Sequence, residues 1–362
     1  MFGEISQDQL VNLEKYKYSC IDKSLLSIYV LQPYWNWAVT LFPLWMAPNL
    51  ITMIGFSFML GNYGILWLVN PTLKDPVSSL MCVSFSIGLW LYSTFDNVDG
   101  RQARRTKSSS PLGQLFDHGC DALNCGVGTI LQTAAMNLGP SYLTAAAVAL
   151  VASAFYITAW EEYHTGTMYL GYLNGPTEGI VLGCLMMLAC AVFGHEIFHQ
   201  VMFGYPLTHL IFGVFFLSLM FIQLPFNVYA VSQTCKNGKR LSDCLKQLNS
   251  FVVFLFLSGS WLYTSNVLKE DFFLFFTILT VVFGRMATKI HLAHLLKQPF
   301  PQSTALLVPL GIGNLLPFTV SESSEHLFVL FYLGLALATY GYWATQIVNS
   351  FCKYLKVRLF RI

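Results

Sequence analysis

Four aspartates with regular spacing are the residues of this sequence best suited to chemistry. Asp96 and Asp99 lie three residues apart, and Asp117 and Asp121 lie four residues apart. On a helix, either spacing places both carboxylates on one face. Carboxylate oxygens are hard ligands that suit Mg²⁺ or Mn²⁺, and two such ions would neutralise four aspartates. The pattern therefore predicts a two-metal site, which can clamp a phosphoryl group between its attacking and leaving oxygens.

The segment between the acidic pairs is basic and contains small residues. It reads GRQARR from Gly100 onward, and Gly100 and Ala103 leave room for a ligand to approach the backbone. The planar guanidinium of Arg104 can bind phosphate through two parallel hydrogen bonds. Acidic pairs that flank a basic segment indicate a diphosphate substrate.

The elements that hold these residues are predicted to be membrane helices. The chain is 55% hydrophobic and 10% charged, with a mean hydropathy of +0.56, whereas soluble domains are about 25% charged. A carboxylate inside a membrane helix costs about 2.5–3.5 kcal/mol, so the aspartates need compensating cations. We expect an all-α, polytopic integral membrane protein with about ten transmembrane helices. Apolar stretches cover approximately 46–69, 78–95, 113–136, 142–160, 176–194, 205–229, 250–267, 271–290, 303–320 and 325–350.

The chain is expected to form one membrane domain with two short flanking segments. Residues 46–350 would hold the helices, with the aspartate pattern at 96–121, and residues 351–362 would form a short basic cytoplasmic tail. Residues 1–45 contain an aromatic-rich run interrupted by Pro33, which indicates an amphipathic segment along the membrane surface, with a plain connecting loop as the alternative. Asp96 and Asp99 are expected to close the second long helix. Ser110 is suited to cap the third helix and Pro111 to its first turn.

The distribution of positive charge predicts the orientation. If both termini are cytoplasmic, all of the 20 lysines and arginines except Lys74 and Lys269 fall on the cytoplasmic side, as lysine and arginine prefer. The aspartates would then lie at the cytoplasmic face. The net charge of +2 follows from this topology and gives no support to nucleic-acid binding. The nine cysteines include no CxxC pair and indicate neither a zinc site nor a disulfide framework.

The aspartate segment resembles a known family signature. DNVDGRQARRTKSSSPLGQLFDHGCD matches DxxDGxxARx(8)GxxxDxxxD at all eight fixed positions, and Arg101 stands where many relatives have lysine. The chain resembles the CDP-alcohol phosphotransferase family, in its eukaryotic choline/ethanolamine (aminoalcohol) phosphotransferase branch. WMAPNLIT, YKYS and NGPTEG extend this resemblance from the N-terminus to about residue 180.

The resemblance implies the fold of that family and transfer of phosphocholine or phosphoethanolamine from CDP-choline or CDP-ethanolamine to diacylglycerol. The products would be phosphatidylcholine or phosphatidylethanolamine and CMP. It also implies a multi-pass homodimer in the endoplasmic reticulum or Golgi bilayer. Two Mg²⁺ or Mn²⁺ ions would be bound by Asp96, Asp99, Asp117 and Asp121. The cytidine diphosphate would contact Gly100, Ala103, Arg104, Gly113, Asn49 and Thr52, although the last two also fit an ordinary helix N-terminus after Pro48.

Two further roles are assigned with alternatives open. The base that accepts the proton of the acceptor hydroxyl would be His118 or Asp121, although an intramembrane histidine also fits a packing role. The alcohol headgroup is expected to contact aromatic and acidic residues, which would otherwise form an interfacial belt. These residues are Trp160, Glu161, Tyr163 and Glu178.

Other functions share parts of this pattern. A phosphatidyltransferase that uses CDP-diacylglycerol and an alcohol such as inositol would show the same aspartates, but such chains are generally shorter. An intramembrane prenyltransferase needs a second paired acidic motif, and after Asp121 only the unpaired Asp243 and Asp271 follow. A divalent-cation transporter would continue its acidic residues across the bilayer, whereas these aspartates gather near one face.

Overall fold

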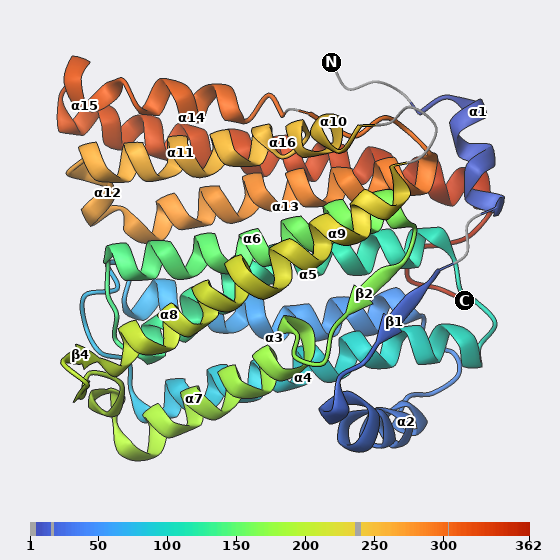
Figure 1. The fold of residues 1–362 in the computed structure, drawn as a ribbon, viewed down its shortest axis with the longest axis horizontal. Helices are drawn as coiled ribbons and strands as arrows, with labels where there is room; N and C mark the ends of the chain where they lie inside the picture. Colours follow the sequence, from blue (N-terminus) through green and yellow to red (C-terminus); the bar gives the residue numbers. More distant parts are fainter. Residues whose placement is uncertain (1–4, 16–17, 236–239, 303) are drawn as a thin grey trace.

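The computed structural model describes residues 5–15, 18–235, 240–302 and 304–362. Tyr16 and Lys17 of the YKYS piece, and Lys236 and Lys239 of the positive charges, lie outside these ranges. Long helices run side by side along the longest axis of the molecule (Figure 1). They are α3 (Pro48–Val69), α4 (Ser79–Arg105), α5 (Pro111–Ala135), α6 (Tyr142–Thr165), α7 (Ile180–Phe193), α13 (Phe272–Leu296) and α16 (Glu322–Leu355).

Shorter helices complete the bundle. The π-helical turn η4 (Gly175–Gly179) leads into α7, and α8 (Leu207–Ser218), η6 (Leu219–Gln223) and α9 (Leu224–Thr234) follow one another without a break. After them come α10 (Leu241–Lys246), α11 (Asn249–Thr264), α12 (Val267–Glu270), α14 (Leu307–Gly313) and α15 (Leu316–Thr319). The remaining elements are α1 (Gln7–Leu10), η1 (Val11–Lys15), β1 (Cys20–Asp22), η2 (Ser27–Leu31), α2 (Gln32–Ala38), η3 (Val39–Leu41), β2 (Met168–Leu170), η5 (His195–Phe198), β3 (Val201–Met202) and β4 (Tyr205–Pro206).

The all-α membrane architecture predicted from composition is confirmed. Among the described residues, six helical segments are long and apolar enough to cross a membrane. They begin at Pro48, Tyr142, Gly175, Leu207, Phe272 and Glu322. Helices α4 and α5 have 27 and 25 residues, but they carry the charged signature. The count of ten spans is therefore not confirmed and stays a prediction.

Helix α13 lies at the centre of the bundle and packs against α5, α6 and α16. The apolar part of α13 that could span a membrane is 83% buried inside the protein. The corresponding part of α16 is only 22% buried. Small residues allow α5 to approach α13 closely: a Cβ atom added to Gly126 would lie 2.0 Å from Thr280 Oγ1. This contact sets the position of α5, and with it the position of Asp117 and Asp121.

Two helix boundaries bear on the site. The prediction that Asp96 and Asp99 close the second long helix is wrong, because α4 continues through the basic segment to Arg105. The predicted start of the third helix is confirmed: the Ser110 side chain accepts a hydrogen bond from Gly113 N, and Pro111 occupies the first turn of α5. Both aspartate pairs therefore lie within helices whose backbones hold them in place.

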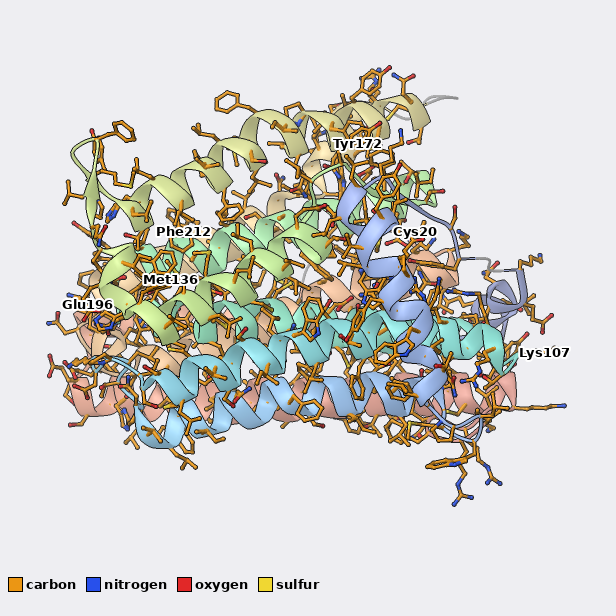
Figure 2. All side chains as sticks on the ribbon, turned by 90° about the horizontal axis from the view of Figure 1, so that it is seen from below. Cys20, Lys107, Met136, Tyr172, Glu196 and Phe212 are labelled. Carbon is orange, nitrogen blue, oxygen red and sulfur yellow. The ribbon has the colours of Figure 1, made fainter. Side chains whose placement is uncertain are left out.

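The N-terminal segment contacts the end of the bundle that holds the aspartate and arginine residues of the family signature. Strand β1 pairs in parallel with β2, with Cys20 opposite Met168. Arg105 Nη1 donates to the carbonyl oxygens of Val39 and Phe42, both at 2.9 Å. Figure 2 shows Cys20 and Lys107 near one end of the molecule and Met136 and Glu196 near the other. Residues 27–41 are helical, so the connecting-loop alternative does not hold there.

Candidate active site

The two acidic pairs meet where α4 and α5 lie side by side. Asp96 and Asp99 come from α4, and Asp117 and Asp121 come from α5. Asp117 interacts electrostatically with the other three carboxylates, and Asp96 does so as well. Asp99 is only 8% exposed, and the other three are half-buried. The spacing in the sequence therefore does bring four carboxylates into one cluster.

Two hydroxyl groups, one on α3 and one on α4, orient two of the carboxylates. Thr52 Oγ1 on α3 donates to Asp99 Oδ2, and the Tyr92 hydroxyl on α4 donates to Asp121 Oδ1 at 2.5 Å. Thr52, which was predicted to face the nucleotide, thus touches the acidic cluster directly. Hydrogen bonds to a carboxylate are stronger than those between neutral groups, so these contacts hold the two aspartates firmly.

The carboxylate atoms that remain without a partner fit a cation. Asp96 Oδ1 and Asp117 Oδ1 are buried and make no hydrogen bond within the described part of the chain. Asp117, His118 and Asp121 can each offer one ligand atom, and these atoms lie within 4.8 Å of one another. Buried charges need a partner of opposite charge. The cluster is therefore chemically suited to divalent metal ions.

The residues predicted to contact the nucleotide gather beside the acidic cluster. Gly113 lies against Asn49, since a Cβ atom added to Gly113 would lie 3.3 Å from Asn49 Oδ1. Asn49 Nδ2 donates to the carbonyl oxygen of Leu359 in the C-terminal tail at 3.0 Å. On α4, a Cβ atom on Gly100 would lie 3.7 Å from Arg104 Nη1, which is an ordinary contact. Three separate segments thus bring their polar and small residues to one place.

The three arginines of the basic segment differ in their contacts. Arg101 Nε donates to Asn36 Oδ1 at 2.9 Å, and its guanidinium lies over the Trp35 ring. Arg105 binds carbonyl oxygens of the N-terminal segment. Arg104 is exposed and has no hydrogen bond or ion pair within the described residues, and Ala103 beside it is half-buried. Arg104 is therefore the arginine that is available to a ligand.

Both candidate bases belong to the cluster. His118 is 5% exposed, and its Nδ1 lies 3.8 Å from Asp121 Oδ2. Its ring stacks on that of His291, with centroids 4.3 Å apart. Gln114 Nε2 lies 3.4 Å from His118 Nε2. Either His118 or Asp121 is placed to accept a proton next to the acidic cluster.

The residues predicted for the headgroup all have partners inside the protein. Trp160 is fully buried, and its Nε1 donates to the carbonyl oxygen of Cys244 at 3.2 Å. The Tyr163 hydroxyl donates to the carbonyl oxygen of Gln298 at 2.8 Å. The buried Glu161 accepts from Asn227 Nδ2. Glu178 accepts from Ser24 Oγ and from the backbone N–H of Asn174. Their role towards a headgroup stays a prediction.

Sequence reasoning missed several polar neighbours of the cluster. Tyr92 precedes Asp96 by one helical turn, which is a signal of a shared face, but a tyrosine in an apolar stretch is common. Glu162 and His291 are separated by 129 positions in the sequence and meet only through the packing of α6 on α13. No spacing rule links them, so only the folded arrangement reveals this pair.

Comparison with known proteins identifies a family and several relatives of this chain. The family model described as CDP-alcohol phosphatidyltransferase matches residues 45–212. The chain is 33% identical to cholinephosphotransferase 1 of Saccharomyces cerevisiae, covering 98% of this chain and 96% of the yeast protein. It is 33% identical to choline/ethanolaminephosphotransferase 2 of Arabidopsis thaliana, covering 99% and 98%. Ethanolaminephosphotransferase 1 of Homo sapiens is 28% identical over 84% of this chain and 81% of the human protein. The chain therefore belongs to the CDP-alcohol phosphatidyltransferase family, and the resemblance of its signature is confirmed.

Proposed function

We propose that this protein transfers phosphocholine or phosphoethanolamine from CDP-choline or CDP-ethanolamine to diacylglycerol, which releases CMP. The observation that carries the proposal is the convergence of Asp96, Asp99, Asp117 and Asp121. Full-length similarity to proteins named for the choline and ethanolamine transfers supports the substrates. Both headgroups are proposed, because relatives named for either one or for both resemble this chain.

The four aspartates are proposed to hold two Mg²⁺ or Mn²⁺ ions. Such ions, when bound, would neutralise the phosphate oxygens and stabilise the charge of the departing CMP. Thr52 and Tyr92 keep Asp99 and Asp121 oriented through their hydroxyl groups. These two residues touch the ligands rather than the substrate, so their role is positioning.

The remaining cluster residues are proposed to bind the nucleotide and to move the proton. Arg104 would bind the diphosphate, because its guanidinium is exposed at the end of α4. Gly100, Ala103, Gly113 and Asn49 would form the surface against which the cytidine diphosphate lies. His118 or Asp121 would accept the proton of the diacylglycerol hydroxyl as its oxygen attacks the phosphorus atom of the headgroup phosphate.

The protein is proposed to act at the cytoplasmic face of the endoplasmic reticulum or Golgi membrane, as a homodimer. Charge distribution supports the orientation, because lysine and arginine favour cytoplasmic segments. Of the two exceptions, Lys74 lies in the connection between α3 and α4, and Lys269 lies in the short helix α12 before α13. Lys74 Nζ pairs there with Glu270 Oε2 at 2.6 Å. The dimer and the organelle come from the resemblance alone.

Purified protein in lipid nanodiscs provides the test. Diacylglycerol is supplied with CDP-choline or with CDP-ethanolamine, and CDP-diacylglycerol with inositol is supplied separately, each with Mg²⁺, with Mn²⁺ or with chelator. We expect metal-dependent CMP release in the first two assays and none with Asp121→Asn. Phosphatidylinositol formation would instead assign the phosphatidyltransferase reaction, and ion flux without CMP release would assign a transporter.

The nucleotide site can be tested separately from the metal site. In Gly113→Ala, the new Cβ atom would press on Asn49 Oδ1 at 3.3 Å. We expect the KM for the CDP-alcohol to rise while the KM for diacylglycerol stays unchanged. Gly128→Ala on the same helix is the matched control, since its Cβ atom would make only an ordinary 3.6 Å contact with Met59. An unchanged nucleotide KM in Gly113→Ala would remove Gly113 from the proposed site.

A further inference from the structure

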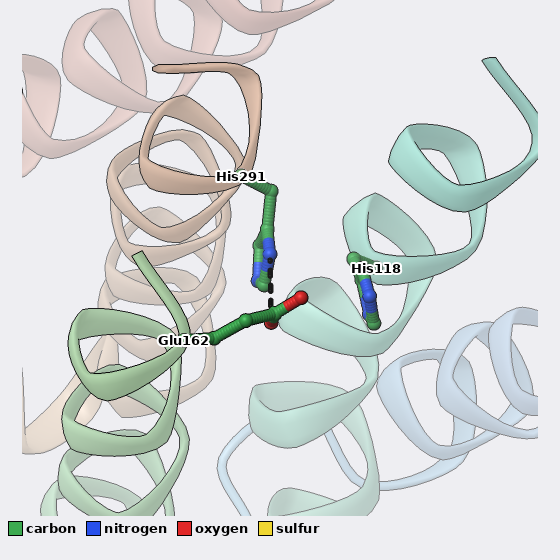
Figure 3. Close-up of side chains that lie close together, drawn as sticks. All are labelled: His118, Glu162 and His291. Carbon is green, nitrogen blue, oxygen red and sulfur yellow. Dashed lines mark ion pairs between the residues drawn. The ribbon is translucent and has the colours of Figure 1, made fainter. Parts of the chain in front are cut away.

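A second group of possible metal ligands lies beside the aspartates and shares His118 with them. His118 on α5, Glu162 on α6 and His291 on α13 lie close together, and the Glu162 carboxylate reaches toward the two rings (Figure 3). Each can offer one ligand atom, and the three atoms lie within 4.8 Å of one another. The three residues are 5%, 2% and 4% exposed. We call this group the His–Glu–His cluster.

The contacts within the cluster leave polar atoms without a hydrogen bond. His291 Nδ1 lies 3.5 Å from Glu162 Oε2, at the distance of an ion pair. Nevertheless, Glu162 Oε2 and His291 Nε2 are buried atoms that make no hydrogen bond within the described part of the chain. Gln114 Nε2 approaches the other carboxylate oxygen, Glu162 Oε1, at 3.5 Å. Among the described residues, these two buried atoms have no hydrogen-bond donor or acceptor, which costs free energy that a bound cation would offset.

The two histidines of the cluster lie directly against each other. The rings of His118 and His291 lie at 18° to each other, with centroids 4.3 Å apart. Both histidines reach the same carboxylate region from different helices. Neutral imidazole nitrogens are preferred ligands of zinc-class ions, and two imidazoles with one carboxylate form an established zinc ligand set.

We propose that the His–Glu–His cluster binds one Zn²⁺ ion, separate from the ions proposed for the aspartates. The aspartate cluster offers mainly oxygen ligands, which favour Mg²⁺ or Mn²⁺, whereas two nitrogens and one oxygen suit zinc. Three protein ligands leave one position of a tetrahedral ion open, as in catalytic rather than structural zinc sites.

The shared histidine gives this site a consequence for activity. His118 belongs both to the His–Glu–His cluster and to the group with Asp117 and Asp121. A ring nitrogen bound to zinc no longer accepts a proton. Under the proposed function, His118 is one of the two residues that can accept the proton of the diacylglycerol hydroxyl. If His118 is that base, Zn²⁺ bound to the His–Glu–His cluster inhibits transfer of the headgroup phosphate. The binding of zinc itself does not depend on that function.

The binding experiment uses the whole purified protein in detergent, without nucleotide or lipid substrate. Co²⁺ is titrated as a spectroscopic substitute for Zn²⁺, and the visible absorption of four-coordinate cobalt reports binding. We expect the four-coordinate cobalt absorption to saturate at one equivalent of this site, and Zn²⁺ to remove it. Changing a group that only supports a ligand costs about 10- to 100-fold in metal affinity. Removing a direct ligand by Glu162→Gln or His291→Gln should therefore weaken binding by more than about 100-fold.

Two controls place the ion. His199→Gln changes a histidine at the opposite end of the molecule, where its Nε2 lies 2.8 Å from the carbonyl oxygen of Met136, and should bind cobalt like the parent protein. Asp96→Asn should also retain the cobalt spectrum while losing Mg²⁺-dependent transfer. Retained binding in Glu162→Gln and His291→Gln, or its loss in Asp96→Asn, would overturn the proposal.

A measurement on the unmodified protein removes the dependence on variant folding. X-ray absorption at the zinc edge should show two imidazole ligands and one carboxylate oxygen around bound Zn²⁺. A shell made only of oxygen atoms, or the absence of any bound zinc at micromolar concentrations, would overturn the site. Neither result would contradict the proposed transferase, whose test uses Mg²⁺ or Mn²⁺ and CMP release.

Discussion

The hydrogen bond between Tyr92 and Asp121 offers the sharpest test of how the acidic cluster is positioned. The Tyr92 hydroxyl donates to Asp121 Oδ1 at 2.5 Å, while Asp121 Oδ2 faces His118. Tyr92→Phe removes the donor and keeps the ring, which is 2% exposed and packs edge-on against Phe56. The substitution therefore changes one polar contact without opening a cavity.

The expected loss follows from the charge of the acceptor. A hydrogen bond to a charged group is worth about 1.5–3 kcal/mol. Since about 1.4 kcal/mol corresponds to a tenfold change in rate, its loss lowers kcat/KM by about 10- to 150-fold if Asp121 must be held during phosphoryl transfer. Residues that orient metal ligands typically contribute about 10- to 100-fold, which agrees with this range.

The assay measures CMP release over a range of Mg²⁺ concentrations, alongside the thermal transition of each variant. Tyr63→Phe is the matched control, because the Tyr63 hydroxyl lies 2.8 Å from the neutral Thr277 Oγ1, away from the aspartates. Tyr63→Phe should keep full activity. If Tyr92→Phe is properly folded and retains at least half of the parent rate, or if both variants lose activity equally, Tyr92 does not position Asp121.

Two further substitutions test the other supports of the cluster. Thr52→Val removes the donor to Asp99 and should lower kcat/KM by about tenfold or more, whereas Thr52→Ser should retain most of the rate; equal rates would show that the hydroxyl has no role. Gly126→Ala places a Cβ atom 2.0 Å from Thr280 Oγ1 and should lower stability by about 1–3 kcal/mol or more through overpacking of α5 on α13. The transition temperature measures this effect, with Gly128→Ala as the control, and an unchanged value for Gly126→Ala would contradict the close packing.

The sequence predicted the parts of the site that depend on local spacing. Asp117 and Asp121 share a face because one helical turn separates them, and the cap at Ser110 follows from side-chain chemistry. The end of α4 was misjudged because Asp96 and Asp99 mark the end of the apolar stretch, whereas the charged residues after them continue the helix to Arg105. The pairing of Glu162 with His291 could not be predicted, since it depends on how α6 and α13 pack in three dimensions.

The attachment of the N-terminal segment has a consequence for protein engineering. Arg101 and Arg105 on α4 donate hydrogen bonds to the N-terminal segment. Strand β1 of that segment pairs with β2, which follows α6 in the chain. Helix α4 and the β2 strand after α6 are thus coupled through a stretch that contributes none of the proposed metal ligands. A truncation that begins at the first long helix would leave cationic side chains without acceptors and one strand without its mate, so shortened versions made for crystallisation should start before residue 20.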